Sequence, residues 1–574
     1  MEVIKHPKGI KARVLLTSVF GPYAQDDEFG SRALNPMELY HNQVTRVQGP
    51  FSLRMFHRSW GIMMIQANIA APCTVLDFPD QERFIREIED NSYDVIGITS
   101  IIPNIGKVAH MCRLIRQHSP KATIVIGGHV ANLPGIEKRI DADHIVRGDG
   151  ISWFRKYLGQ DATAPIAHPV LLSGFGGRAL GIKLSAKPQD TAGVLIPSVG
   201  CPVGCNFCST SAMFGGKGNS IDFFDTGREL FSLMCRLEEK LQINSFFVMD
   251  ENFLLRRERS LDLLKQMKRY DKSWSLFVFS SARVIQSYTI EELVGLGISW
   301  VWMGLEGENS SYAKLRGVDT RALIRNLQEN GIRVLGSSII GLETHTPENI
   351  DAVIAHSVAH NTDFHQFMLY TPVPGTPLYE EHRAKGTLLE DVDEADTHGQ
   401  YQFNFRHPHI SKEQSEKFLL SAFQKDFDIN GPSIMRIART TLEGWKKHKN
   451  HPEARIRARY AREAKIIPVN YASALWAMEQ YFRKSNPHVA GQARDLLSEI
   501  KREFGLKSRL LIPIVGRIAN WAMRREEKKL NQGWTYQPPT FVERANWDQP
   551  GSFTTEGMKN LVSPILSLPT SNEA

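Results

Sequence analysis

Two long series of alternating strands and helices constrain the fold of this chain more than any other feature. In the first series, short apolar segments rich in β-branched residues alternate with segments whose apolar residues recur at helical spacing. Strands that alternate with helices form a parallel sheet covered on both faces. The series therefore predicts a doubly wound, flavodoxin-like sheet for residues 1–160. Its predicted strands are residues 12–19, 74–78, 95–100, 123–127 and 144–146, and its clearest helices are 81–89 and 105–117.

Sheets of this kind bind ligands at the carboxyl ends of their strands. In this chain those ends carry small and flexible residues, and glycine there lets a ligand approach the backbone closely. The residues predicted to contact a ligand are Thr99, Ser100, Gly127, Gly128, Gly148 and Gly150. The pattern predicts a ligand crevice without identifying the ligand.

A stretch rich in Gly, Pro and Ala, residues 161–192, is predicted to link this sheet to the second series, residues 193–385. Six β-α units there predict a partial barrel, because a closed barrel needs eight. Its predicted strands are residues 193–198, 245–249, 276–280, 300–304, 334–340 and 366–370. Residues 386–545 are predicted to be mainly helical, and the polar tail, 546–574, to be poorly ordered.

Three cysteines lie together at the start of the second series, spaced as Cys201-x3-Cys205-x2-Cys208. Thiolates are the ligands of iron–sulfur clusters, and three of them leave the fourth iron of a 4Fe–4S cluster open for a chelating ligand. Gly200 and Gly204 permit the tight turns that such a loop needs. The alternatives are structural zinc, which usually takes four ligands and would need a second cysteine pair, and a coincidental group of structural cysteines.

This spacing, with aromatic Phe207 before the last cysteine, resembles the signature of the radical S-adenosylmethionine (SAM) superfamily. The resemblance implies that SAM chelates the open iron, and that one electron cleaves it to methionine and a 5′-deoxyadenosyl radical. The later segments FFVMDENFLL, VWMGLEGENSSYAKLRG, SSIIGLETHTPENI and YTPVPGTPLY resemble the same family in the order of its barrel. The SAM-binding residues that the resemblance implies are Phe207, Asp250, Glu306, Ile340 and Gly341. Taken singly, carboxylates such as Asp250 and Glu306 are more often surface or capping residues than functional ones.

Residues 1–160 resemble the cobalamin-binding domain that precedes the barrel in one branch of that superfamily. The matching pieces are DVIGITSIIPNI, TIVIGGHVAN and ADHIVRGDG. The resemblance implies cobalamin as the ligand of the crevice, and the alternative is a domain that serves only as a scaffold. The chain lacks the DxHxxG motif whose histidine binds cobalt in other cobalamin domains, as do many members of this branch. A methylthiotransferase would need a second cysteine triplet here, where only Cys73 and Cys112 are present.

The leading hypothesis is a cobalamin-dependent radical SAM enzyme that methylates an unactivated carbon. In the scheme that the resemblance implies, methylcobalamin supplies the methyl group and the deoxyadenosyl radical opens the substrate C–H bond. An external donor would supply electrons, and no side chain is predicted as a substrate acid or base. The alternatives are cyclisation, rearrangement or carbon–carbon coupling with the same cofactors, and a non-catalytic sensor of cobalamin or of the cluster.

Basic residues are concentrated near the C-terminus. Residues 431–470 hold ten Lys and Arg against three Glu, and this excess of seven equals the formal net charge of the chain, +7. A later stretch, residues 507–530, mixes basic residues with Leu510, Leu511, Ile514, Ile518 and Trp521. That mixture is typical either of a helix on an anionic membrane, which would suit a lipid substrate, or of a helix packed on the barrel. Nucleic acid is not expected, because no RNA-binding module is visible.

Cysteine is scarce outside the triplet, and neither a signal peptide nor an apolar stretch long enough to span a membrane is apparent. We therefore expect a cytoplasmic protein with a small-molecule or lipid substrate, peripheral at the inner face of a membrane if the C-terminal stretch binds lipid.

Overall fold

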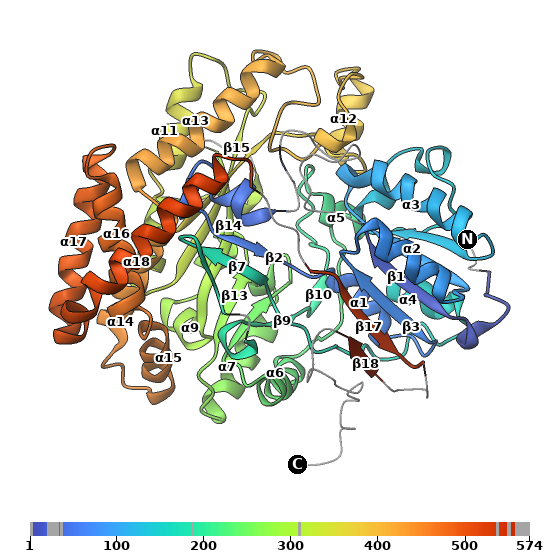
Figure 1. The fold of residues 1–574 in the computed structure, drawn as a ribbon, viewed down its shortest axis with the longest axis horizontal. Coiled ribbons are helices and arrows are strands. Elements are labelled where there is room, and N and C mark those ends of the chain that lie inside the picture. The colour runs from blue at the N-terminus through green and yellow to red at the C-terminus, as the bar shows by residue number, and fades with distance from the viewer. Residues whose placement is uncertain are drawn as a thin grey trace.

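The computed structural model describes residues 4–19, 34, 38–185, 187–307, 312–534, 539–547 and 553–556. Figure 1 shows the N-terminal sheet at the right, a second parallel sheet in the middle and a layer of helices at the left. Within these residues, no helix combines the length and the apolar character needed to cross a bilayer.

The N-terminal domain has the predicted flavodoxin-like topology. Its five parallel strands lie in the order β3-β1-β4-β5-β6, so that the first strand of the chain sits inside the sheet. Alternate residues of β1 point to opposite faces: Leu15 joins the core under α2 and α3, whereas Val14 and Leu16 join the core under α1 and α4. These elements are β1 (Val14–Ser18), β3 (Cys73–Asp77), β4 (Val95–Thr99), β5 (Thr123–Gly127), β6 (His144–Ile145), α1 (Trp60–Ala67), α2 (Gln81–Asp90), α3 (Ile105–His118) and α4 (Gly150–Tyr157).

The second sheet is the predicted partial barrel. Its six strands run parallel in chain order, β9-β12-β13-β14-β15-β16, and helices cover their outer face. The strands are β9 (Gly193–Leu195), β12 (Ser245–Val248), β13 (Ser275–Phe279), β14 (Ile298–Glu306), β15 (Arg333–Ile340) and β16 (Phe364–Leu369). The helices are α5 (Ser209–Met213), α6 (Gly227–Leu241), α7 (Arg257–Arg269), α8 (Ala282–Gln286), α9 (Ile290–Gly295), α10 (Thr320–Glu329), α11 (Ile350–Val358) and α12 (Pro377–Ala384).

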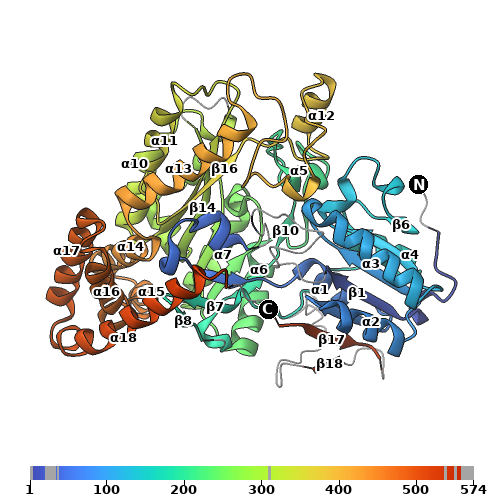
Figure 2. The same cartoon turned by 45° about the horizontal axis from the view of Figure 1, so that its top comes forward.

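The end of the chain differs from the prediction of a helical region followed by a disordered tail. β17 (Phe541–Ala545) pairs antiparallel with β3, and β18 (Phe553–Glu556) pairs with β17, so the hairpin extends the N-terminal sheet. Figure 2 shows this hairpin beside α1 and α2. The edge of β3 offers unpaired backbone groups, and a returning strand satisfies them. The remainder of the predicted tail, residues 557–574, lies outside the described residues.

The predicted linker, 161–192, also contains strands. β7 (Phe175–Ala179) pairs with β2 (Arg54–Phe56) and with β8 (Ile182–Lys183) in a small antiparallel sheet. Its glycines suggested a loop, but one of them permits close packing, since a Cβ on Gly181 would lie 2.5 Å from the carbonyl oxygen of Ala522. β2 lies within the range predicted for the first domain but pairs outside the N-terminal sheet.

The C-terminal region is helical as predicted, and its basic stretch packs against the barrel. Arg455 and Arg459 of this stretch are buried and donate to the carbonyl oxygens of Gly295 and Val294. Part of the local positive charge therefore serves packing. The helices are α13 (Lys412–Asn430), α14 (Ser433–His448), α15 (Ala454–Ala464), α16 (Ala472–Phe482), α17 (Pro487–Phe504) and α18 (Leu506–Leu530).

Candidate functional site

The loop after β9 carries the three cysteines. Cys208 caps the N-terminus of α5, where its sulfur accepts from the backbone N–H of Ser211, and the hydroxyl of Ser211 donates to the carbonyl oxygen of Cys201 at 2.7 Å. Gly204 has φ +66°, and a Cβ there would lie 2.4 Å from the backbone of Lys217. Glycine at this position thus allows the turn that the sequence predicts, and the loop is a compact unit tied to a helix start.

All three cysteines line one cavity of about 430 Å³ at the carboxyl end of the barrel strands. None of them forms a disulfide, and each is partly exposed. Among the described residues no three His, Cys, Asp or Glu side chains converge on a point that would hold one metal ion. In a 4Fe–4S cluster, by contrast, each thiolate binds a different iron. The donor chemistry of the loop, three free thiols facing a cavity, fits the predicted cluster.

A buried ion pair lies beside the cysteines. Glu306, at the end of β14, pairs with Lys314, and the Lys314 ammonium lies 5.2 Å from the ring centre of Phe207. Glu306 has φ +54°, which is uncommon for a residue with a side chain, and the strand register shifts at this point. Burial alone would lower the pKa of Lys314, but the nearby Glu306 carboxylate and Cys205 sulfur raise it, which keeps the ammonium charged.

Phe207 and Glu306, two of the five residues predicted to bind SAM, line this cavity, whereas the other three do not. The buried Asp250 carboxylate accepts from the Ser198 hydroxyl at 2.6 Å and pairs with Arg259 at 2.5 Å. The backbone N–H of Gly341 donates to His345, and Phe403 packs so closely against this glycine that a Cβ would lie 2.3 Å from its ring. Ile340 is likewise buried and absent from the cavity wall.

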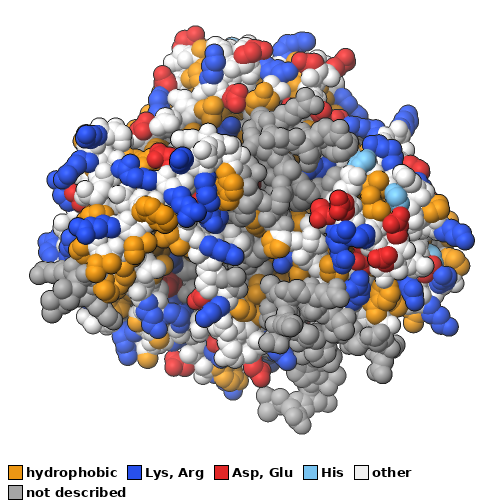
Figure 3. Space-filling view, in the orientation of Figure 1, with side chains coloured by type: hydrophobic (Ala, Val, Ile, Leu, Met, Phe, Trp, Pro, Cys, Tyr) orange, Lys and Arg blue, Asp and Glu red, His pale blue; other side chains and the backbone are white. Residues whose placement is uncertain are grey.

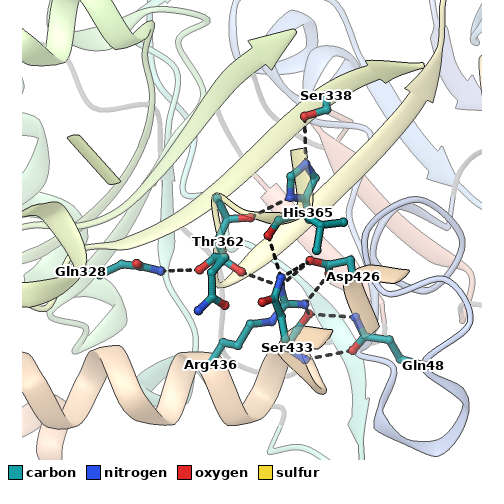
Figure 4. A network of polar contacts seen from close by, with 11 residues as sticks. Gln48, Gln328, Ser338, Thr362, His365, Asp426, Ser433 and Arg436 are labelled. Carbon is teal, nitrogen blue, oxygen red and sulfur yellow. Dashed lines mark hydrogen bonds and ion pairs between the residues drawn. The ribbon is translucent and has the colours of Figure 1, made fainter. Parts of the chain in front are cut away.

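The wall that faces the cysteines on β15 is formed by Ser337, Ser338 and Ile339 instead. Figure 4 shows how a buried network fixes Ser338: His365 lies between the hydroxyls of Ser338 and Thr362, at 3.0 and 3.1 Å. Burial holds the pKa of His365 well below its ordinary value, so the ring is neutral and can donate one hydrogen bond and accept another. The hydrogen bonds of His365 thereby connect Ser338 in the cavity wall to Thr362 outside the cavity.

The network continues into the C-terminal helices. Arg436 of α14 donates to the carbonyl oxygen of Thr362 at 2.8 Å and pairs with Asp426 of α13 at the same distance. Ser433 of α14 exchanges hydrogen bonds with the side chain of Gln48, which lies near the N-terminus of the chain. Segments that are distant in sequence thus support one wall of the cavity.

A second cavity of about 430 Å³ lies at the carboxyl end of the N-terminal sheet, between that sheet and the cysteine loop. Five of the six residues predicted to contact a ligand line it: Thr99, Gly127, Gly128, Gly148 and Gly150. Ser100 is not part of the wall, although its buried hydroxyl has no hydrogen-bond partner among the described residues. Most other lining side chains are apolar, and they include Trp60, Ile65, Phe154, Met213, Phe214 and Met249.

Two glycines shape this second cavity in different ways. Gly128 has φ +80°, and a Cβ there would lie 2.7 Å from both the Ser100 carbonyl oxygen and the Thr99 hydroxyl. A Cβ on Gly127 would meet no atom within 4 Å and would project into open space. The backbone therefore forms a cradle that a side chain would fill, which fits a large, flat and mostly apolar ligand such as a corrin.

Thr210 and Glu251 line both cavities and so form their shared wall. Burial raises the pKa of Glu251 to about 7, and its Oε2 finds no hydrogen-bond partner among the described residues. Glu251 and Lys314 were not predicted from the sequence. Their positions gave a signal, since Glu251 lies three residues after the end of β12 and Lys314 lies eight residues after Glu306 in a segment already singled out.

Comparison with protein families agrees with this division of the chain. Residues 56–157 match the model of the B12 binding domain, and residues 195–356 match that of the radical SAM superfamily. The first match covers four of the five parallel strands around the apolar cavity, and the second covers the cysteine loop and the strands β12 to β15. The cofactors implied by these two domains are cobalamin, SAM and a 4Fe–4S cluster.

Individual proteins show weaker similarity. The uncharacterized methyltransferase PH0819 of Pyrococcus horikoshii is 24% identical over 354 residues, which cover 55% of this chain and 74% of that protein. The bacteriochlorophyllide d C-12(1)-methyltransferase of Chlorobaculum tepidum is 28% identical over 220 residues, 37% of this chain and 47% of that protein. The radical SAM methyltransferase TsrM from Kitasatospora setae, solved with tryptophan substrate and a SAM analogue, gives a TM-score of 0.48 at 16% identity, covering 79% of this chain and 99% of that one.

Proposed function

We propose that this chain, which joins a B12-binding domain to a radical SAM domain, is a methyltransferase that acts on an unactivated carbon. The observation that supports the proposal best is the wall that the two cavities share at Thr210 and Glu251. A group held in one cavity would face a group held in the other across two side chains. Cobalamin-linked chemistry needs such proximity between a methyl carrier and a carbon radical.

The residues of each cavity have distinct tasks in this proposal. Cys201, Cys205 and Cys208 would hold the cluster, and the ion pair of Lys314 with Glu306 would lie beside it. Gly127 and Gly128 would let a corrin lie close to the backbone. When bound, the cluster, SAM and cobalamin supply the electron, the radical and the methyl carrier.

The side chain of Glu251 would face the groups bound in both cavities. Its carboxyl group has one oxygen available, and a pKa near 7 lets it either donate or accept a hydrogen bond at neutral pH. Glu251 and Thr210 line both cavities, and every other lining residue belongs to one cavity alone. We therefore propose that Glu251 positions the two reacting groups relative to each other.

The test begins with anaerobic purification and cluster reconstitution, followed by metal analysis and an absorption spectrum with and without hydroxocobalamin. Reduction in the presence of SAM should release 5′-deoxyadenosine. Incubation with SAM that carries a deuterated methyl group, and with extracts of candidate substrates, should yield a labelled product. A product that lacks the label but has a new ring or carbon–carbon bond would overturn methyl transfer and favour the cyclase or coupling chemistry. Failure to cleave SAM with an intact cluster would favour a sensor.

We further propose that the substrate is a small apolar molecule or a lipid, that an external donor supplies electrons, and that the C-terminal region makes a peripheral contact with a membrane. The match to the radical SAM superfamily fits a small-molecule substrate and an external electron donor.

A further inference from the structure

Helix α18 (Leu506–Leu530) packs through one face and leaves the opposite face open. Ile512, Ala519 and Met523 of this helix are buried in the core of the C-terminal helices. Gly516 lies on the same side, where a Cβ would come within 2.6 Å of the Trp476 ring of α16. The helix is therefore firmly seated, and its outer face is presented in a fixed orientation.

Large apolar side chains line that outer face. Leu511, Ile514, Ile518 and Trp521 are 42%, 62%, 56% and 62% exposed. Steps of three and four residues place them in one stripe along the helix. Thirteen large apolar side chains are exposed in the described residues, and this stripe holds four of them. Isolated exposed apolar residues need no explanation, but a continuous stripe marks an interaction surface.

The charged residues of the same outer face are all basic. Arg517, Arg524, Arg525 and Lys528 are exposed, and the Arg525 guanidinium lies 5.4 Å from the ring centre of Trp521. The two acidic residues of the helix are engaged elsewhere. Glu526 is buried and pairs with Arg178 of β7 at 2.8 Å, and Glu527 accepts from the Tyr481 hydroxyl. Figure 3 shows orange side chains grouped at the left of the molecule, with blue Lys and Arg side chains next to them.

The neighbouring hairpin adds to this surface. The turn between β7 and β8 packs on α18 at Ala522, and Ile182 and Leu184 beside it are 43% and 39% exposed. Lys183 lies between them and is also exposed. The combined surface, which we name the α18 face, consists of Ile182, Lys183, Leu184, Leu511, Ile514, Arg517, Ile518, Trp521, Arg524, Arg525 and Lys528.

We propose that the α18 face docks the protein on the surface of a bilayer that contains anionic lipids. The apolar stripe would enter the boundary between headgroups and acyl chains, and the basic side chains would bind lipid phosphates. A second copy of the chain is a poorer occupant, because two faces that carry only positive charge repel each other. The α18 face would supply the residues of the peripheral contact proposed above, and an anionic bilayer would be its partner. This docking rests on the proposed contact and not on the proposed reaction.

Vesicle flotation tests the docking. The purified full-length protein is mixed with vesicles of phosphatidylcholine alone, or of phosphatidylcholine with phosphatidylglycerol, and the fraction that floats is measured at low and high salt. We expect binding to the anionic vesicles, weaker binding at high salt and little binding to the neutral ones. The variant I514S/I518S/W521S should lose at least about tenfold in lipid affinity. The variant R517Q/R524Q/R525Q should lose the preference for anionic lipid.

The matched control is I429S on α13, where the side chain is 51% exposed but lies outside the α18 face. This variant should float like the wild type. Equal flotation of the wild type and I514S/I518S/W521S would overturn the proposal, as would absence of flotation with every vesicle. A wild-type dimer in light scattering that the same variant converts to a monomer would assign the face to a second copy instead. Release of 5′-deoxyadenosine by each variant separates a docking defect from failure of the proposed reaction.

Discussion

The two cavities that meet at Glu251 are lined by different kinds of residues. The cavity on the N-terminal sheet is formed mainly by glycine backbone and apolar side chains, whereas the cavity on the barrel presents thiols, hydroxyls, two amides and a buried ion pair. Both lie at the carboxyl ends of parallel strands, so fold alone does not explain the difference. The cavity on the N-terminal sheet can select a large ligand by shape, and the cavity on the barrel can select by coordination and charge. A mutation in one cavity should therefore impair a different binding function from a mutation in the other.

The largest effect is expected from removing the three thiols. The variant C201A/C205A/C208A should bind no cluster and release no 5′-deoxyadenosine, since no other described side chains offer a thiolate to that cavity. It should still bind cobalamin, because the apolar cavity uses none of these side chains. Iron analysis and a cobalamin titration measure both properties. Loss of cobalamin binding together with the cluster would show that the two cavities are not independent.

The converse experiment fills the apolar cavity. A leucine at Gly127 would project into open space, so G127L should fold normally but weaken cobalamin binding by at least about tenfold through steric exclusion. Its cluster content should be unchanged. G491L on α17 is a suitable control, because a Cβ there also meets no atom within 4 Å and the site lies far from the cavity in sequence. Unchanged cobalamin affinity in G127L would show that cobalamin does not bind in this cavity.

The contrast between the cavities also explains what the sequence could predict. Both sheets follow from periodicity, and the glycines of the cavity on the N-terminal sheet follow from their place at strand ends. The cavity on the barrel depends on side-chain direction, which sequence spacing does not give. Asp250 and Glu251 are adjacent, yet Asp250 turns toward Arg259 and Glu251 lines the cavity. The strands β17 and β18 were missed because nothing local indicates pairing with a strand more than 460 residues earlier.

Replacing Glu251 should uncouple the cavities without emptying either. E251Q keeps the shape of the side chain but removes its charge, and E251L also removes its hydrogen bonds. We expect both variants to retain the cluster and cobalamin, while methylated product falls about tenfold or more relative to 5′-deoxyadenosine. The ratio of the two products is the measurement. A constant ratio in both variants would show that Glu251 does not position the reacting groups.

A smaller effect is expected from the ion pair of the barrel cavity. K314M leaves the buried Glu306 carboxylate without its partner, which should cost about 3 kcal/mol of unfolding free energy and weaken SAM binding. K314R keeps the charge and should recover most of the stability. Denaturant unfolding and equilibrium dialysis with SAM report the two effects, and the glycine-lined cavity should bind cobalamin as before. If K314M is as stable as the wild type, the pair contributes nothing to this wall.

The smallest effect is expected at the edge of the N-terminal sheet. It should distinguish the stability of that sheet from the stability of the barrel sheet. Burial raises the pKa of Glu543 on β17 to about 7, although Arg58 opposes the shift. A carboxyl group with a raised pKa in the folded state stabilises that state fully below its unfolded pKa, and this contribution is lost as the pH rises through about 7. The loss amounts to at most about 3 kcal/mol.

Hydrogen exchange can locate this loss within the molecule. Between mildly acidic and mildly basic pH, and after correction for the intrinsic exchange rate, β3 and β17 should lose protection while β14 and β15 of the barrel should not, because Glu543 lies on β17 of the first sheet, where it pairs with Val75 of β3. E543Q has no proton to lose and should flatten the pH dependence of β3 and β17 alone. If the variant keeps the slope of the wild type, another group controls this edge. If the barrel strands lose protection in parallel, the two sheets unfold as one unit, and the independence of the two cavities would not extend to their stability.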